Sequence, residues 1–283
     1  MASEFPSKIT LEKAIPCAIL TKLVNIGNQS ICRLSTNSTQ GSAGLIQSQH
    51  NGVDYYLLIT CNHVLPFTAR DDLFDVAIHF EGLPNLLGSQ DKLQKQWVQF
   101  CLTSVKYDAT VIELTQDFVK ILGDNGATFL TPLNDNLRIN QAIALVQYPG
   151  GVLHFSHGEI YDITNKINVY YWVDGDKGSS GSPVLTFEGY PFAVHTSQIG
   201  PTNAQDPGKR ETRGGVLLKV ILSCYFEDRI AFSGCVIAYM RDPKSFLDNY
   251  LFFAADRLTC QQMLVSQAQW IRILLGTTNH FTI

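Results

Sequence analysis

The feature that most constrains this chain is a short loop of small residues, Gly178-Ser179-Ser180-Gly181-Ser182-Pro183. Glycines flank the serine pair and permit backbone conformations that other residues avoid, and an apolar strand-like run follows Pro183. A serine hydroxyl is a weak nucleophile at neutral pH, so a chain that uses one also needs a base and donors for an oxyanion. The backbone N–H groups of Gly178 and Ser180 are candidate donors. The alternative interpretation is a structural turn between two strands.

A base and an acid occur earlier in the chain. His63 ends the apolar stretch Tyr56-Leu57-Leu58-Ile59-Thr60-Cys61-Asn62-His63, and Asp108 opens the stretch Asp108-Ala109-Thr110-Val111-Ile112-Glu113-Leu114. Both stretches have the composition and length of buried strands. The chain therefore presents His63, Asp108 and Ser180 in this order, each at the end of a predicted strand or in a loop.

These three segments resemble the motifs of chymotrypsin-like serine proteases. The usual forms in that family are Gly-Asp/Asn-Ser-Gly-Gly/Ser-Pro, Thr-Ala-x-His and Asp-x-Ala-x-Leu-x-Leu, and the order His, Asp, Ser is that of chymotrypsin. The resemblance covers residues 28–225. It implies an all-β fold of two six-stranded antiparallel β-barrels, with the active site between them and a helical extension at the carboxy terminus.

The resemblance also implies a role for each motif residue. Ser180 is the expected nucleophile, His63 the general base and acid, and Asp108 the group that orients His63. The N–H groups of Gly178 and Ser180 form the expected oxyanion hole. The expected activity is hydrolysis of peptide bonds in a protein or peptide substrate through an acyl-enzyme, with no cofactor and no metal.

A second aspartate, Asp75, competes with Asp108 for the role of the acid. The segment Asp75-Val76-Ala77-Ile78 matches the aspartate motif as well as the segment at Asp108 does. Asp75 follows His63 so closely that no strand fits between them, whereas Trp97 to Leu102 supplies a strand before Asp108. We therefore expect Asp108 to be the acid.

The sequence leaves open which substrate residue the specificity pocket prefers. Asp174 stands where trypsin-like enzymes have the residue at the base of the pocket, which would favour Arg or Lys. His195 lies in a strand similar to one in glutamyl endopeptidases and viral chymotrypsin-like proteases, where a histidine reads Glu or Gln, but its spacing from Ser180 also occurs in proteases that prefer aromatic residues. The structural alternative is a buried core histidine. Thr196 and Ser197 are expected to begin the backbone edge that pairs with substrate.

Ser179 departs from the digestive enzymes of the family, which have an aspartate before the nucleophile that pairs with a newly cut amino terminus. A serine cannot form that ion pair, and the chain has no Ile-Val-Gly-Gly type start. Activation by trypsin-style clipping is therefore not expected.

Net charge, hydropathy and cysteine content limit the expected binding partners and cellular location. The net charge of −4 argues against nucleic-acid binding, and no segment has the length and hydropathy of a membrane span or a secretory signal. The 7 cysteines are odd in number and scattered, which favours reduced thiols and an intracellular, cytoplasmic or nuclear location. His154 and His157 have a metal-like spacing, but no nearby Cys or Asp completes a site.

The predicted organisation has three parts. Residues 1–27 form an amino-terminal arm that ends in a strand-like run from Ile19 to Val24, and residues 28–225 form the protease domain, with barrels at about 28–120 and 140–225. A turn-rich connection separates the barrels, and Val216 to Tyr225 supplies a closing helix. Residues 226–283 form a mainly helical extension, suited either to core packing or to docking and self-association.

Two further functions were weighed against the serine endopeptidase. The first is a catalytically silent protease fold used as a binding module, and the second is an acyl hydrolase that acts on other substrates with the same three residues. The presence of all three residues favours an enzyme over the silent module, because only chemistry requires the complete set.

Overall fold

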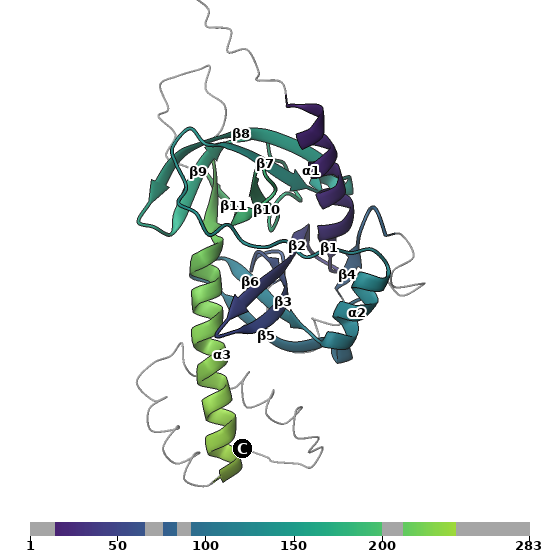
Figure 1. Ribbon diagram of the computed structural model, residues 1–283, viewed down its shortest axis with the longest axis vertical. Coiled ribbons are helices and arrows are strands. Elements are labelled where there is room, and N and C mark those ends of the chain that lie inside the picture. The colour runs from purple at the N-terminus through teal and green to yellow at the C-terminus, as the bar shows by residue number, and fades with distance from the viewer. Residues whose placement is uncertain (1–14, 66–75, 84–91, 200–211, 242–283) are drawn as a thin grey trace, which may run out of the picture.

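The computed structural model describes residues 15–65, 76–83, 92–199 and 212–241, which form two six-stranded antiparallel units stacked along the long axis (Figure 1). The first unit has the strand order β4-β1-β2-β3-β6-β5, and the second is a closed barrel in the order β10-β11-β12-β9-β8-β7. In the described residues no ladder joins β4 to β5. The expected all-β fold of two six-stranded antiparallel parts is confirmed.

The strands of the first unit are β1 (Ile31–Ser35), β2 (Gln40–His50), β3 (Val53–Thr60), β4 (Ala77–His79), β5 (Val98–Ser104) and β6 (Ala109–Leu114). Those of the second unit are β7 (Ala142–Gln147), β8 (His154–Thr164), β9 (Asn168–Trp172), β10 (Pro183–Thr186), β11 (Pro191–Ile199) and β12 (Thr212–Leu217). Two short 3₁₀ turns are η2 (Lys95–Trp97) and η3 (Pro149–Gly151).

The hairpin between β2 and β3 shows how the sequence sets the register. Asn51 and Gly52 both have positive φ, 51° and 77°, which is the backbone of a two-residue hairpin turn. His50 then pairs with Val53, and the ladder continues to the pair Gly44 and Ile59. In this register the last four residues of β3, Leu57 to Thr60, are buried, and the exposed His63 follows them.

Helix α1 (Cys17–Ser30) replaces the strand-like run expected from Ile19 to Val24. Its buried residues Leu23, Ile26, Gly27 and Ser30 recur at helical spacing and lie on one face, which packs on both β1 and β7. A six-residue segment that is only partly apolar does not distinguish a strand from a helix with one buried face, so the expected strand was wrong. The arm is thus a packed helix from Cys17 onward that spans both units (Figure 1).

Helix α2 (Gln116–Asp124) occupies part of the connection that was expected to be turn-rich. Phe118 is buried and stacks on Trp97, with ring centroids 4.3 Å apart and planes 3° apart. The glycines and polar residues at 123–126 form only the end of this helix, where Gly126 has a φ of +91°. The turn-forming residues at 123–126 do form a turn, and this turn ends a helix.

Helix α3 (Leu218–Arg241) begins within the range expected for the closing helix and continues beyond residue 225. Its Tyr225 hydroxyl and the Arg229 guanidinium both donate to the carboxylate of Glu113 on β6, and Glu113 is 5% exposed. The described start of the expected extension is therefore core packing on the first unit. The helices expected from Asp242 and from Gln261 to Leu275 lie outside the described residues.

Within the described ranges, no helix combines the length and the apolar character that a membrane crossing needs.

Candidate active site

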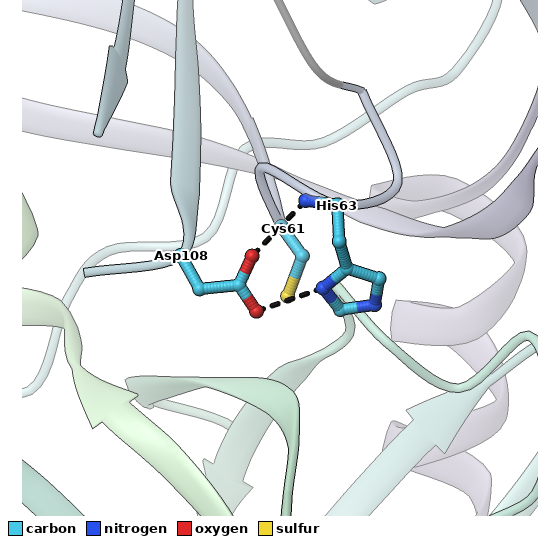
Figure 2. Close-up of side chains that lie close together, drawn as sticks. All are labelled: Cys61, His63 and Asp108. Carbon is cyan, nitrogen blue, oxygen red and sulfur yellow. Dashed lines mark hydrogen bonds and ion pairs between the residues drawn. The ribbon is translucent and has the colours of Figure 1, made fainter. Parts of the chain in front are cut away.

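His63 and Asp108 meet where β3 ends and β6 begins. These strands pair antiparallel, with Thr60 opposite Thr110, so the residues just beyond the pair approach each other. One carboxylate oxygen of Asp108 lies 2.8 Å from His63 Nδ1, and the other accepts the backbone N–H of His63 at 3.0 Å (Figure 2). A carboxylate only accepts, so Nδ1 carries a proton, and the neutral form of this imidazole has its lone pair on Nε2. This is the tautomer that a general base requires.

Asp108 has an unusual backbone conformation. Its φ is +46°, in the left-handed region that few residues other than glycine, asparagine and aspartate adopt readily. The conformation ends the turn that starts at Val105, whose carbonyl accepts the N–H of Asp108 at 3.3 Å. The turn aims the carboxylate back at His63. The competing Asp75 lies outside the described residues.

The loop around Ser180 depends on two glycines with positive φ, Gly178 at +101° and Gly181 at +89°. A Cβ on Gly178 would lie 2.5 Å from the carbonyl oxygen of Tyr148, and a Cβ on Gly181 would lie 2.1 Å from that of Ser42. Both the conformation and the space therefore exclude a side chain. The loop packs backbone against backbone on either side of Ser180.

The N–H groups of this loop fall into two sets, those with a backbone acceptor and those without. Those of Ser179, Gly181 and Ser182 donate to the carbonyls of Asp176, His195 and Ser179. Among the described residues, the N–H groups of Gly178 and Ser180 donate to no protein group. Gly178 is buried, and a buried N–H without a partner is rare. The two expected oxyanion donors are therefore the two that are left available.

Ser179, where digestive enzymes of the family have aspartate, has a local structural role. Its side chain is buried, and its hydroxyl accepts the N–H of Asp176 at 2.9 Å while its own N–H donates to the Asp176 carbonyl. This reciprocal pair closes the turn before Ser180. The loop thus takes its shape without an ion pair at this position.

Ser42 on β2 joins the loop to the first unit. Its N–H donates to the carbonyl of Ser180, and its hydroxyl donates to the carbonyl of Gly178, each at 2.8 Å. The same hydroxyl accepts the N–H of Tyr148 at 3.0 Å. The sequence showed only that the strand around Ser42 consists of small residues, which indicated close packing and gave no sign of this serine's role.

A single carbonyl oxygen brings the histidine segment and the serine loop together. The oxygen of His195 on β11 accepts the Cys61 thiol at 3.1 Å and the N–H of Gly181 at 2.8 Å. Cys61 precedes His63 by two positions and Gly181 follows Ser180 directly. The segments that carry His63 and Ser180 therefore lie next to each other, and in the described residues no hydrogen bond joins the Ser180 hydroxyl to His63.

Two solved protease structures share the arrangement of the two units. The active form of the Rv3671c protease from M. tuberculosis aligns with a TM-score of 0.52 at 11% identity, over 74% of this chain and 85% of that one. The serine endoprotease from Yersinia pestis aligns with a TM-score of 0.52 at 10% identity, over 76% of this chain and 67% of that one. The chain has the chymotrypsin-like fold. No protein-family model and no curated protein sequence matches it.

In this chymotrypsin-like fold, His195 is buried at 4% exposure beside the serine loop. Its Nδ1 lies 2.7 Å from the hydroxyl of Tyr171, which also lies 3.0 Å from the carbonyl of Gly214. Burial, the nearby Arg213 and His63 lower the pKa of His195 to about 3. His195 is therefore neutral at physiological pH and held in one orientation.

His195 Nε2 and Gln147 Oε1 both lie near the backbone of Gly175. A Cβ on Gly175 would lie 3.3 Å from His195 Nε2 and 3.7 Å from the Oε1 atom of Gln147. That Gln147 oxygen is buried without a hydrogen-bond partner, whereas its amide nitrogen donates to Ser156 and to the carbonyl of Asp174. Sequence reasoning missed Gln147, because a single glutamine at the end of an apolar strand carries no motif.

The other expected pocket residues differ in their surroundings. Asp174 is exposed, and Arg213 donates to the carbonyl of the neighbouring Gly175 at 2.6 Å. Thr196 is buried and pairs with Gly214 on β12, and the β11 register shifts between Thr196 and Ile199. Ser197 belongs to that irregular part of β11, and its side chain lies outside the described residues.

A large groove elsewhere on the molecule is separate from these groups. It lies between the end of the β2–β3 hairpin, the connection around residues 131–137 and the start of α3, and His63, Asp108 and Ser180 do not line it.

Proposed function

We propose that the chain is a serine endopeptidase with His63, Asp108 and Ser180 as its catalytic triad. The observation that carries the proposal is the combination of two features: an imidazole whose Nδ1 is held by Asp108, and a serine loop in which the N–H groups of Gly178 and Ser180 are available as donors. The chymotrypsin-like fold supports it, because the two aligned structures are proteases.

The proposed reaction has two stages. Ser180 attacks the scissile carbonyl while His63 Nε2 takes the hydroxyl proton, and the N–H groups of Gly178 and Ser180 bind the oxyanion. His63 then gives its proton to the leaving amine, and an acyl-enzyme remains on Ser180. Water, deprotonated by His63, releases the acyl group and restores the serine. Asp108 stabilises the imidazolium in both stages and stays ionised.

We propose glutamine as the preferred residue on the amino side of the scissile bond. Tyr171 holds one hydroxyl proton between His195 and Gly214, so His195 Nε2 either donates or accepts a hydrogen bond. A carboxamide has both a carbonyl acceptor and an N–H₂ donor, so it satisfies either tautomer and can also donate to Gln147 Oε1. A glutamate carboxylate has no donor for Gln147, and neutral His195 offers it no charge.

The exposed position of Asp174 does not favour the Arg or Lys alternative, since a specificity carboxylate acts at the closed end of a pocket. Thr196 and Ser197 remain the proposed edge for the substrate backbone. The substrate class is protein or peptide. An intracellular location, self-association or docking through the carboxy-terminal helices, and the three-part division of the chain remain hypotheses.

Covalent labelling by a fluorophosphonate probe tests the triad. We expect the wild-type protein to be labelled, and Ser180→Ala and His63→Ala to lose the label while remaining folded. Peptides that differ only in Gln, Glu, Arg or Phe before the scissile bond then test specificity. Absence of labelling would favour the silent binding module. Labelling with turnover of simple esters but no peptide would favour the acyl hydrolase.

A further inference from the structure

Three different metal-ligating side chains gather at the proposed active site. Ligand atoms of Cys61, His63 and Asp108 all lie within 4.8 Å of one another, and Figure 2 shows the thiol directed toward the pair formed by the imidazole and the carboxylate. The Thr-Ala-x-His motif has alanine where this chain has Cys61. The cysteine therefore adds a sulfur ligand to a pair that otherwise offers nitrogen and oxygen alone.

The position of the sulfur is fixed. Cys61 is fully buried at 0% exposure, and its thiol donates to the carbonyl of His195 at 3.1 Å. The other two groups are more accessible, since the side chains of His63 and Asp108 are 42% and 24% exposed. An ion therefore has a path to the cluster from the side of His63 and meets the sulfur at the inner end.

We propose that this cluster binds a thiophilic divalent cation of the zinc class, through Cys61 Sγ, His63 Nδ1 and an Asp108 carboxylate oxygen. Zinc binds sulfur at about 2.3 Å and nitrogen or oxygen at about 2.0–2.2 Å, so ligand atoms spaced as these are need to move by only about 1 Å to share one ion. Cysteine, histidine and aspartate are common zinc ligands, and water completes the tetrahedron.

Binding redistributes two protons. The thiol proton leaves to solvent as the metal–sulfur bond forms. The single ring proton of His63 moves from Nδ1 to Nε2 by way of solvent, so the imidazole that ligates the ion through Nδ1 is the other neutral tautomer. His63 in this form has no lone pair for the Ser180 hydroxyl, and Asp108 no longer holds the Nδ1 proton. The bound ion is thus an inhibitor and not a cofactor; this consequence rests on the proposed protease function.

Cadmium titration tests the site without any assay of activity, because a cadmium–thiolate bond has its own ultraviolet charge-transfer absorption. We expect saturable absorption in the wild type. Affinity should fall by more than about tenfold in Cys61→Ala and Cys61→Ser, since even groups that only support metal ligands contribute about 10–100-fold. Cys61→Ser keeps a hydroxyl near the His195 carbonyl and so separates loss of the ligand from loss of packing.

Cys17 supplies a matched control, because it is an exposed free cysteine that belongs to no such group in the described residues. Cys17→Ala should retain the high-affinity absorption. Equal titration curves for the wild type and both Cys61 variants would overturn the site, as would absorption lost in Cys17→Ala.

Zinc inhibition tests the consequence. The rate of each variant is first divided by its own rate in the presence of chelator. Zinc should then inhibit the wild type and Cys17→Ala at concentrations more than about tenfold lower than those that inhibit the Cys61 variants. Chelator should restore the wild-type rate. Cadmium binding at Cys61 without zinc inhibition would overturn the inhibitory role. If no substrate is turned over, the protease proposal fails and the cadmium titration still decides the site.

Discussion

The backbone N–H of Ser42 donates to the carbonyl of Ser180 over 2.8 Å, from a strand of the first unit to the loop of the second. The Ser42 hydroxyl makes a further bond to Gly178, so one buried residue holds both sides of the proposed nucleophile. The geometry of the oxyanion donors therefore depends on a residue in the other unit.

Replacing Ser42 with alanine should weaken both folding and catalysis. Ser42→Ala keeps the N–H bond to Ser180 but leaves the Gly178 carbonyl and the Tyr148 N–H without their partner, at a cost of about 1–3 kcal/mol. Denaturant unfolding and the rate of fluorophosphonate labelling measure the two effects. Ser48→Ala, farther along β2, is the control and should change neither by more than about 0.5 kcal/mol. If Ser42→Ala changed neither stability nor the labelling rate, Ser42 would not be the residue that holds the serine loop.

Alanine variants of Gly181 and Gly52 distinguish the cost of a steric clash from the cost of a positive φ. Both have positive φ, +89° and +77°, but a Cβ on Gly181 meets the Ser42 carbonyl oxygen at 2.1 Å, whereas nothing lies within 4 Å of a Cβ on Gly52. Gly52→Ala should cost about 1 kcal/mol, the price of the left-handed conformation. Gly181→Ala should cost more and abolish labelling. Similar unfolding midpoints for the two variants would show that the loop can move away from β2.

Asp108→Asn should lower kcat by about 10⁴-fold, because an amide can donate to Nδ1 and so favours the wrong imidazole tautomer. Asparagine tolerates a φ of +46°, so the free energy of unfolding should change little. Asp108→Ala should lose both activity and stability. Peptide turnover and denaturant unfolding of the two variants make the comparison, and full activity in Asp108→Asn would rule out the proposed orienting role.

The buried His195 predicts a pH dependence of stability. Its pKa is lowered from 6.5 to about 3 by burial, Arg213 and His63, so the unfolded state binds more protons between these values. Stability from this residue is present above pH 6.5 and is lost as the pH falls toward 3, with a slope of at most about 1.4 kcal/mol per pH unit. Unfolding at pH 7 and pH 5 should show this slope, and His195→Gln should reduce it. An unchanged slope would contradict the assignment.

Arg229 should anchor α3. Arg229→Met removes one of the two side-chain donors that the described residues direct at the buried Glu113 carboxylate, the other being Tyr225, so we expect a loss of about 3 kcal/mol in unfolding free energy. Adding Glu113→Gln to Arg229→Met should recover part of that loss, because the buried charge is gone. A double variant less stable than the single one would argue against an uncompensated charge as the cause.

The sequence predicted the parts of the molecule whose chemistry is local. Strands with apolar alternation and a hairpin at Asn51-Gly52 were found at nearly the observed positions, and the motifs at His63 and Asp108 led to a pair that the β3–β6 ladder brings together. Counting strands was enough to prefer Asp108 over Asp75, because we expected at least one more strand between the histidine and the aspartate of a barrel.

The remaining features are set by tertiary contacts. The helical period of α1 is visible only once Leu23 and Ile26 are known to share a buried face, and the turn residues near Gly126 gave no sign of the helix they end. Ser42, Gln147 and Cys61 bond to partners that lie far away in the chain. Single polar residues in apolar strands carry no motif, so sequence alone did not reveal them.

The carbonyl of His195 accepts donors from Cys61 in the first unit and Gly181 in the second. Because a ribosome makes the first unit before the serine loop, a nascent chain holds its base and acid well before it holds a shaped nucleophile. Under the proposed function, the growing chain cannot cleave itself or its neighbours until the second unit has been made and docked. Under that function, the complete site exists only after both units have been made.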